Sequence, residues 1–299
     1  MEEKLRSSDD TITKNLNRVA HEQSDLLELR SIELSELADR ALITVSELLV
    51  PDMGVYEILS AIFECITDCS NCVSDFSVED KVVLSKYLAR ELLKNGFTER
   101  DFFDIALHDS TVTYVKNPYA DEAYEVFSEE LSDARVKYSR DFAECTRMLY
   151  NREVSYCLFP LEEKGGTRLP TVAELIYRND LKINSITPVF GPDNSLDLKY
   201  ALVSNHFTVP ERTDEDDRYL EIRVPKSDST HLSELLFSAE LFGHTVYRVD
   251  TQFFAGELSE DMYFSIVIRD NDELFLPLLV YITLFVHEYN LIGMYKNLE

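Results

Sequence analysis

Three cysteines in the first quarter of the chain have a spacing that could do chemistry. Cys65, Cys69 and Cys72 form a Cys-x3-Cys-x2-Cys pattern, and three thiolates at such spacing can hold an iron–sulfur cluster. The same positions are i, i+4 and i+7, which share one face of a helix, where cysteine behaves as a small buried hydrophobe. Because the surrounding residues have helical spacing, we interpret the three cysteines as core residues. A metal or cluster site and redox chemistry are the alternatives.

A glutamate and several cations near the middle of the chain form a second candidate site. Glu162 ends an apolar run, and Lys164, Arg168 and Lys199 could attract an anion to this region. The simpler interpretation is solvated surface charge for the three cations. For Glu162, the simpler role is capping of backbone N–H groups at the end of a strand.

The remaining chemistry-bearing residues match no nucleotide or nucleophile motif. His206, His231 and His244 are scattered without metal-ligand spacing. The sequence contains no Walker A motif, no Gly-x-Ser-x-Gly turn and no dinucleotide-binding fingerprint. We therefore predict that the protein uses no cofactor.

The composition argues against two classes of partner. Among 299 residues, 56 are acidic and 29 are basic, so the net charge is -27, which repels nucleic-acid phosphates. The most apolar stretch, residues 274–286, is too short to span a bilayer and predicts a buried helix. The N-terminus has no signal-peptide pattern, and five cysteines without one fit a reducing compartment. We expect a cytoplasmic protein that binds neither nucleic acid nor membrane.

The elements that must position these residues begin with helices. Residues 1–23 are polar and predict a frayed N-terminus, whereas residues 24–108 carry helical hydrophobic spacing and predict an all-α domain. Ser77 and Asp80 form a capping-box pattern at the start of the third helix of this domain. Residues 98–107 predict a short fourth helix.

The hydrophobic period changes over residues 109–205. Strands alternate with helices there, which favours right-handed βαβ units and a mainly parallel sheet. Two further strands flank Gly191-Pro192-Asp193-Asn194, which is strong turn chemistry, and predict a final antiparallel pair. The predicted strands before that pair are 111–115, 134–138 and 154–161, and the predicted helices are 119–131, 141–151 and 170–180.

The last third of the chain has a different order of elements. Residues 206–217 are acidic and poor in strand formers, and predict a linker. Residues 218–299 predict the order βαββαβ of the ferredoxin-like fold, with strands 218–225, 245–253, 261–269 and 291–296 and helices 229–242 and 272–288. The predicted fold class is therefore α+β with several domains: an all-α domain, a single α/β lobe and a ferredoxin-like unit.

One segment of the lobe resembles the central motif of prephenate dehydratases. In that family a strand ends in Pro-Ile-Glu-Asn-Ser, followed by a glycine and a helix. The sequence "NREVSYCLFPLEEKGGTRLPTVAELIYRNDLKI" keeps this order: Pro160, Leu161 and Glu162 match, while Glu163 and Lys164 replace Asn and Ser. Upstream, "VTYVKNPYADEAYEVF" stands where the family has a strand, a glycine-rich turn and a helix, but it contains no glycine.

The resemblance covers residues 110–299 and implies that the C-terminal βαββαβ unit is an ACT domain, a module that binds regulatory amino acids. It also implies a homodimer in which ACT domains pair edge to edge. In the feedback-regulated members, two motifs hold phenylalanine. The corresponding ligand-binding residues here are Thr230, His231, Leu232, Asp250, Thr251 and Gln252.

The predicted turn at residues 191–194 bears on catalysis. In prephenate dehydratases the chain crosses here into a second lobe and returns through a strand with Thr-Arg-Phe, whose threonine is the main catalytic residue. In this chain a tight turn replaces the lobe, and Leu198-Lys199-Tyr200 stands at the Thr-Arg-Phe position. Loss of water from prephenate needs a proton donor and a closed site, and leucine donates nothing. Glu162 and Lys199 remain as vestigial candidates.

These features favour a non-catalytic relative of prephenate dehydratase that acts as a small-ligand sensor or regulatory scaffold, an aromatic amino acid being one possible ligand. One alternative is an active prephenate dehydratase of phenylalanine biosynthesis. It could be fused to a chorismate mutase, because Arg30 in the helical segment 26–42 resembles an arginine of that domain. The other alternative is a purely structural interaction protein.

Overall fold

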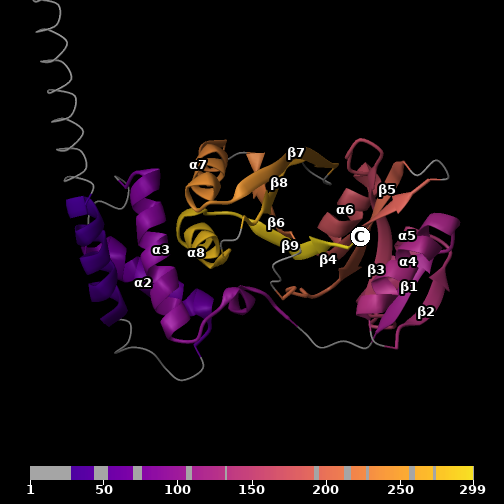
Figure 1. Cartoon of the computed structure of the whole chain (residues 1–299), viewed down its shortest axis with the longest axis horizontal. Coiled ribbons are helices and arrows are strands. Elements are labelled where there is room, and N and C mark those ends of the chain that lie inside the picture. Colours follow the sequence, from indigo (N-terminus) through magenta and orange to yellow (C-terminus); the bar gives the residue numbers. More distant parts are fainter. Residues whose placement is uncertain are drawn as a thin grey trace, which may run out of the picture.

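The protein is a helical N-terminal part joined to one continuous mixed sheet (Figure 1). The computed structural model describes residues 28–43, 53–69, 76–105, 110–131, 133–191, 195–211, 217–226, 229–255, 260–271 and 274–298. The predicted N-terminal segment 1–23 and most of the acidic run within the predicted linker lie outside the described residues.

The elements agree closely with the predicted ones in type and order. A helix spans residues 28–43. The other helices are α2 (Val55–Cys69), α3 (Val78–Lys94), the 3-10 helix η2 (Glu99–Phe102), α4 (Pro118–Glu130), α5 (Phe142–Tyr150), α6 (Pro170–Arg178), α7 (Ser229–Leu241) and α8 (Leu276–Phe285). The strands are β1 (Thr111–Val115), β2 (Arg135–Ser139), β3 (Tyr156–Glu163), β4 (Lys182–Phe190), β5 (Leu196–Ser204), β6 (Arg218–Pro225), β7 (Thr245–Ala255), β8 (Glu260–Arg269) and β9 (Asn290–Asn297).

The helical part departs from the prediction at its end. The capping box of Ser77 and Asp80 is present and starts α3, as predicted. The fourth helix predicted over residues 98–107 is wrong, because only the four residues of η2 are helical. Phe103 then takes extended backbone angles, and Ile105 forms a bridge with Phe207 instead of continuing a helix.

The α/β lobe comprises β1 to β5 and α4 to α6. Its strands β2, β1 and β3 are parallel, as predicted from the alternation of strands and helices. The predicted hairpin is confirmed: β4 and β5 pair antiparallel from Lys182–Ser204 to Phe190–Leu196. The turn between them closes with a hydrogen bond from the Gly191 N–H to the Ser195 carbonyl, 2.9 Å. Residues 192–194 of the predicted turn lie outside the described residues.

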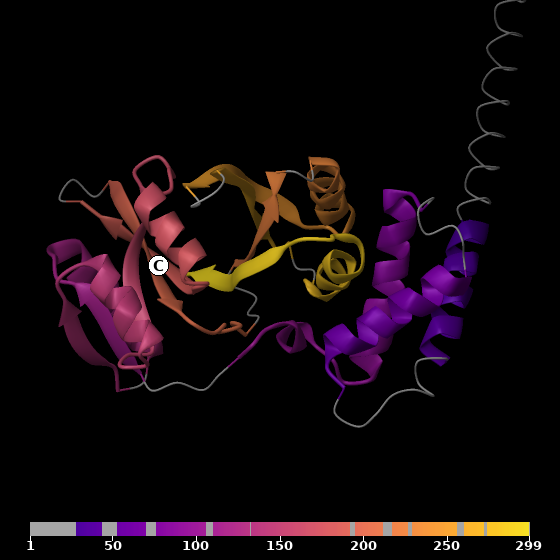
Figure 2. The ribbon, with the colours of Figure 1, turned by 180° about the vertical axis from the view of Figure 1, so that it is seen from behind.

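The C-terminal unit comprises β6 to β9 with α7 and α8. It contains the predicted βαββαβ order of elements, and its strands lie in the order β9-β6-β8-β7. The sequence did not predict that β9 pairs with β4 of the lobe, which makes one sheet of order β2-β1-β3-β5-β4-β9-β6-β8-β7 (Figure 2). A Cβ atom at Gly293 would clash with the Ile183 carbonyl oxygen, so glycine permits this close pairing.

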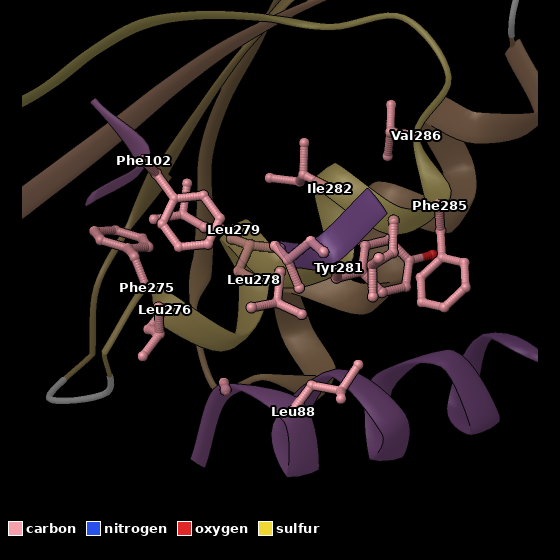
Figure 3. Packing of buried hydrophobic residues seen from close by; sticks show 14 of the residues in the cluster. Leu88, Phe102, Phe275, Leu276, Leu278, Leu279, Tyr281, Ile282, Phe285 and Val286 are labelled. Carbon is pink, nitrogen blue, oxygen red and sulfur yellow. The ribbon is translucent and has the colours of Figure 1, made fainter. Parts of the chain in front are cut away.

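One face of the C-terminal unit packs against helices. The apolar side chains of Leu220, Ile222 and Val224 in β6 lie under α7 and α8, in the same core cluster as residues of α2 and α3. Figure 3 shows Leu88 of α3 beside residues of α8 in this cluster. Helix α8 is buried on almost all sides, as predicted for residues 274–286. Within the described part of the chain, no helix has the length and apolar character needed to cross a membrane.

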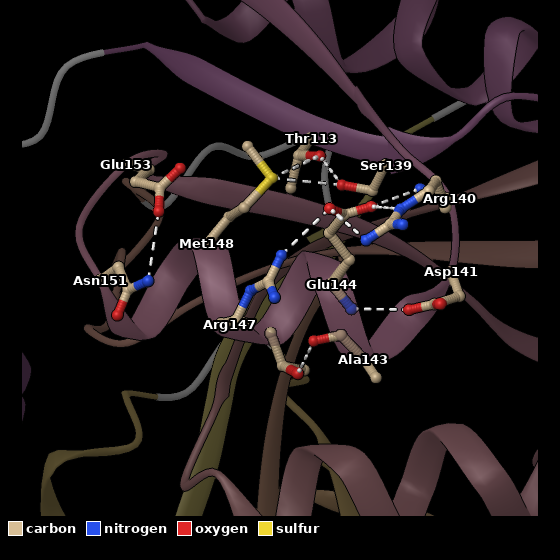
Figure 4. A network of polar contacts seen from close by, with 11 residues as sticks. Thr113, Ser139, Arg140, Asp141, Ala143, Glu144, Arg147, Met148, Asn151 and Glu153 are labelled. Atoms are coloured by element: carbon tan, nitrogen blue, oxygen red, sulfur yellow. Dashed lines mark hydrogen bonds and ion pairs between the residues drawn. The ribbon is translucent and has the colours of Figure 1, made fainter.

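The outer end of the lobe contains a small polar and sulfur network (Figure 4). The hydroxyls of Thr113 in β1 and Ser139 in β2 are 2.6 Å apart, and the Ser139 hydroxyl lies 3.3 Å from the sulfur of Met148 in α5. Both hydroxyls are buried, so this network satisfies them and ties α5 to the parallel strands.

The buried His244 generates a prediction about pH. Its side chain is 3% exposed and its ring stacks on Phe275, with 4.7 Å between ring centroids. Burial lowers the pKa of His244 to about 4. An unfolded histidine titrates near about 6.5, so between these values the unfolded chain binds more protons and stability falls as pH falls.

We expect this group to remove about 3 kcal/mol of unfolding free energy between pH 7 and pH 4. Urea denaturation at both pH values measures the loss, and His244→Phe should remove this component. His287→Gln, a change at an exposed histidine, is the control and should leave the pH dependence as it is. An identical pH dependence in His244→Phe and the unmodified protein would contradict the assignment.

Candidate functional site

A turn between β3 and α6 carries the lobe's side of the site. Gly165 and Gly166 have φ values of 95° and 81°, which favour glycine, and they reverse the chain after Glu163. The turn is closed by the Gly166 N–H on the Glu163 carbonyl and by the Glu163 N–H on the Thr167 carbonyl, each 2.9 Å. This geometry places Arg168 opposite Glu162, in an isolated antiparallel bridge.

From this turn Arg168 reaches the C-terminal unit. Its Nη2 lies 2.7 Å from Oε2 of Glu221 in β6, and its Nε lies 3.5 Å from Oε1 of Glu162. Arg248 in β7 approaches from the other side, with Nη1 2.7 Å from Oε1 of Glu162 and Nε 2.8 Å from Oδ2 of Asp250. We call Glu162, Arg168, Glu221, Arg248 and Asp250 the junction cluster.

Glu221 is the most deeply buried member of the junction cluster. Its side chain has no exposed surface, and its oxygens also accept hydrogen bonds from Ser265 (2.7 Å) and Tyr295 (3.0 Å). Burial alone would raise the pKa of Glu221, but the charge and hydrogen bond of Arg168 outweigh it and the pKa lies below its usual value. Burial, and then the nearby Glu221 charge, raise the pKa of Tyr295, which stays a neutral donor.

A cavity of about 610 Å3 opens beside the junction cluster. One wall is the β3–α6 turn with the first residues of α6, and the other is β7. We call it the junction cavity, and its lining residues are Gly165, Gly166, Thr167, Arg168, Pro170, Ala173, Arg248, Asp250, Thr251, Gln252, Phe253 and Phe254. Its lining combines two guanidinium groups, one carboxylate, an amide and aromatic rings, and a volume of this size is typical of small-molecule sites.

An aromatic stack and an arginine lie next to the junction cavity. The rings of Tyr177 in α6 and Phe254 in β7 stack at 4.2 Å with an interplanar angle of 4°. The guanidinium carbon of Arg223 lies 5.0 Å from the centroid of the Tyr177 ring and 5.2 Å from that of Phe254. Arg223 also donates its Nε hydrogen to Oε1 of Gln252, at 3.2 Å. The contact between the lobe and the C-terminal unit therefore includes aromatic stacking as well as ion pairs.

The structure brings together half of the six predicted ligand-binding residues. Asp250, Thr251 and Gln252 all line the junction cavity. Leu232 lies in α7 and packs against the helix-covered core cluster, and it is not among the lining residues of this cavity. Thr230 and His231 lie at the start of α7, but their side chains are outside the described ones.

The interpretation of the central cations as surface charge is wrong for Arg168, which is 9% exposed and ion-paired. It fits Lys164, which is exposed and contacts the Ser195 hydroxyl at 3.0 Å. Lys199 is largely buried, with its Nζ 3.8 Å from Oε2 of Glu162. Glu162 itself pairs with cations and does not act as the expected backbone cap. An isolated sequence offers no means to tell a buried arginine from an exposed one.

The cysteines fall in the helical part. Cys65 lies in α2 and packs against the core cluster, as the packing interpretation predicted. Cys69 is the last residue of α2, and Cys72 lies outside the described residues. Among the residues that the structure describes, no group of three or more His, Cys, Asp or Glu side chains is arranged to hold a metal ion.

Sequence reasoning missed Glu221, Arg223, Arg248, Ser265 and Tyr295. A signal existed in β6, where charged residues alternate with Leu220, Ile222 and Val224 in "RYLEIRVP". Such alternation is ordinarily typical of a strand with one face in water. Here the polar face is covered by the lobe, which the sequence of β6 alone cannot reveal.

Comparisons with known proteins give partial similarities of fold. No protein-family profile and no curated protein matches the chain. Similar solved structures include prephenate dehydratase from Streptococcus mutans (14% identity, 63% of this chain and 98% of that chain, TM-score 0.46). Others are GqqA, described as a quorum-quenching acylase (14%, 63%, 95%, 0.46), and prephenate dehydratase from Arthrobacter aurescens in complex with L-Phe (12%, 62%, 89%, 0.45). At this identity and TM-score, the similarity concerns backbone arrangement and assigns no activity.

The junction cluster generates a prediction about stability. Changing Arg168→Met removes the cation of a fully buried carboxylate while keeping an unbranched side chain. We expect a loss of about 3–5 kcal/mol in unfolding free energy, because Glu221 and Glu162 would stay buried with too little positive charge. Lys164→Met, four positions earlier in the chain and exposed, is the control and should change stability by less than about 0.5 kcal/mol. Similar denaturation midpoints for the two variants would contradict the role given to Arg168.

Proposed function

We propose that this protein is a non-catalytic relative of prephenate dehydratases that senses a small ligand, and that the ligand binds in the junction cavity. An aromatic amino acid is the class of ligand that the sequence resemblance implies. The observation that carries the proposal is the cavity itself, because Asp250, Thr251 and Gln252 line it. The family resemblance of the sequence implies a ligand-binding role for the same three residues.

The absence of catalysis is supported at the positions where the family carries it. The hairpin of β4 and β5 stands where the family has a second lobe, so no second lobe among the described residues covers Leu198-Lys199-Tyr200. Among the described residues, the partners of the Glu162 carboxylate are the cations of Arg168, Arg248 and Lys199. A carboxylate held in this way neutralises charge and is poorly placed to move a proton to a substrate.

A sensing role is supported by where the cavity lies. Its walls come from the lobe and from the C-terminal unit, which are far apart in the sequence. A ligand that touches both walls favours the arrangement in which they are close, and it stabilises that arrangement in proportion to its occupancy. Binding in the cavity would thereby stabilise the contact between the lobe and the C-terminal unit.

A homodimer formed at the sheet edge is part of the proposal. β7 is the outermost strand on the C-terminal side of the sheet, so its outer edge can pair with another strand. Tyr247, Val249 and Phe253 of β7 are 51%, 40% and 64% exposed. An exposed edge strand with apolar side chains is suited to pairing with the same strand of a second copy.

Thermal unfolding in the presence of phenylalanine, tyrosine, tryptophan or prephenate tests the proposal. A ligand at a hundred times its dissociation constant adds about 2.7 kcal/mol, which moves the midpoint by several degrees. We expect one aromatic amino acid to produce the shift, and the double variant Asp250→Asn, Thr251→Val to lose it. Glu240→Gln, an exposed change in α7 that is outside the cavity lining, should keep the shift.

The other outcomes are equally informative. A shift with prephenate alone would contradict the non-catalytic assignment and direct attention to a working active site. If none of the four compounds moves the midpoint, the sensor proposal fails and a structural interaction protein becomes the better description.

A further inference from the structure

The charges around the junction cavity do not balance. Ion pairs link the three carboxylates of Glu162, Glu221 and Asp250 with Arg168, Arg248 and Lys199. Arg223 is a fourth cation beside Gln252, and it makes no ion pair with any described carboxylate. Among the described side chains, one positive charge is therefore in excess, inside a protein whose net charge is -27.

Arg223 carries this excess charge and is buried away from solvent. Arg223 is 3% exposed, its guanidinium lies beside the stacked Tyr177 and Phe254 rings, and its Nε donates to Gln252. Aromatic faces compensate a cation only in part. Burial of a charge without a counter-ion is unfavourable, so a nearby anion would stabilise this arrangement.

Gln252 connects the arginine to the cavity. Because Oε1 of Gln252 accepts from Arg223, its NH2 group has to point elsewhere. The Gln252 residue is 7% exposed, it lines the cavity, and its Nε2 has no hydrogen-bond partner. The Arg168 guanidinium lies in the opposite wall, and its Nε, 3.5 Å from Oε1 of Glu162, makes no hydrogen bond to any described residue. A buried amide donor without an acceptor, facing a guanidinium that has only a long ion pair at its Nε, indicates room for a further acceptor.

We propose that the junction cavity recognises the carboxylate of its ligand. The NH2 group of Gln252 and the guanidinium of Arg168 donate to the carboxylate, and its charge offsets the excess cation of Arg223. The apolar part of the ligand lies against Pro170, Ala173 and Phe254. This inference rests on the proposed function, because it takes the cavity as the ligand site and names the chemical group that is recognised there.

The cavity favours a monocarboxylate over a more highly charged anion. Only one positive charge is in excess, and the Asp250 carboxylate in the same lining would repel a second negative charge. Asp250 can accept a hydrogen bond from an ammonium group, but it is already paired with Arg248. The carboxylate is therefore the group that the cavity neutralises, and an ammonium group adds to the affinity through Asp250.

Calorimetric titration of the full chain with three probes tests this assignment. L-Phenylalanine carries both groups, hydrocinnamate keeps the carboxylate and lacks the amine, and phenethylamine keeps the amine and lacks the carboxylate. We expect phenylalanine and hydrocinnamate to bind and phenethylamine not to bind. Equal binding of phenethylamine and phenylalanine would overturn the assignment.

The variant Gln252→Glu tests the same contact in the protein. Glutamate has the shape of glutamine and can accept from Arg223, but it replaces the NH2 donor by a negative charge. We expect the affinity for both carboxylates to fall at least tenfold, about 1.4 kcal/mol, with the thermal midpoint of the free protein kept or raised. Glu240→Gln, an exposed change in α7 outside the cavity lining, should leave the affinity unchanged.

The inference and the proposed function can fail separately. If phenylalanine binds and Gln252→Glu keeps its affinity, the sensor stands and the carboxylate assignment is wrong. If no probe binds and no compound moves the thermal midpoint, both are wrong. Should Gln252→Glu fail to fold, Gln252→Met removes the NH2 group at similar length, and undiminished carboxylate binding by that variant would also overturn the assignment.

Discussion

The rest of the structure depends on the buried carboxylate of Glu221, whose charge has to be met by groups held in fixed positions. Ser265 and Tyr295 of the same sheet donate hydrogen bonds, but the neutralising cation, Arg168, comes from the turn before α6 in the lobe. A contact between residues 53 positions apart therefore links the lobe to the C-terminal unit, in addition to the strand pairing within the sheet. The pairing of Gly293 with Ile183 supports the same junction from within the sheet.

The junction cavity follows from the way this contact is made. Two sets of charges approach from opposite walls, and the NH2 group of Gln252 has no hydrogen-bond acceptor among the described residues. A site built in this way gains most from a ligand that completes its hydrogen bonds. The charge network that joins the halves would then also be the part of the molecule that responds to the ligand, which is a simple physical basis for sensing.

Much of the fold could be predicted from local patterns, and the exceptions are informative. The capping box at Ser77, the alternation of strands and helices, and the turn residues at 191–194 each act within a few residues. The segment after Phe102 does not continue the predicted helix, because Ile105 pairs with Phe207, which lies about a hundred residues away. In the site, the family resemblance indicates Asp250, Thr251 and Gln252 as ligand-binding residues. The sequence around Glu221 and Arg223, by contrast, is typical of a strand with a solvent-exposed face. These two side chains are buried only because the lobe covers that face.

Native-state hydrogen exchange tests most directly whether the junction makes one cooperative body of the lobe and the C-terminal unit. The backbone amides of Ile183 in β4 and Ile222 in β6 lie on either side of it. If the buried charges and the β4–β9 pairing join the halves, both amides exchange through the same global opening and report the same free energy. Exchange of one amide through an opening smaller by more than about 2 kcal/mol would show that one half unfolds alone, and would contradict this account.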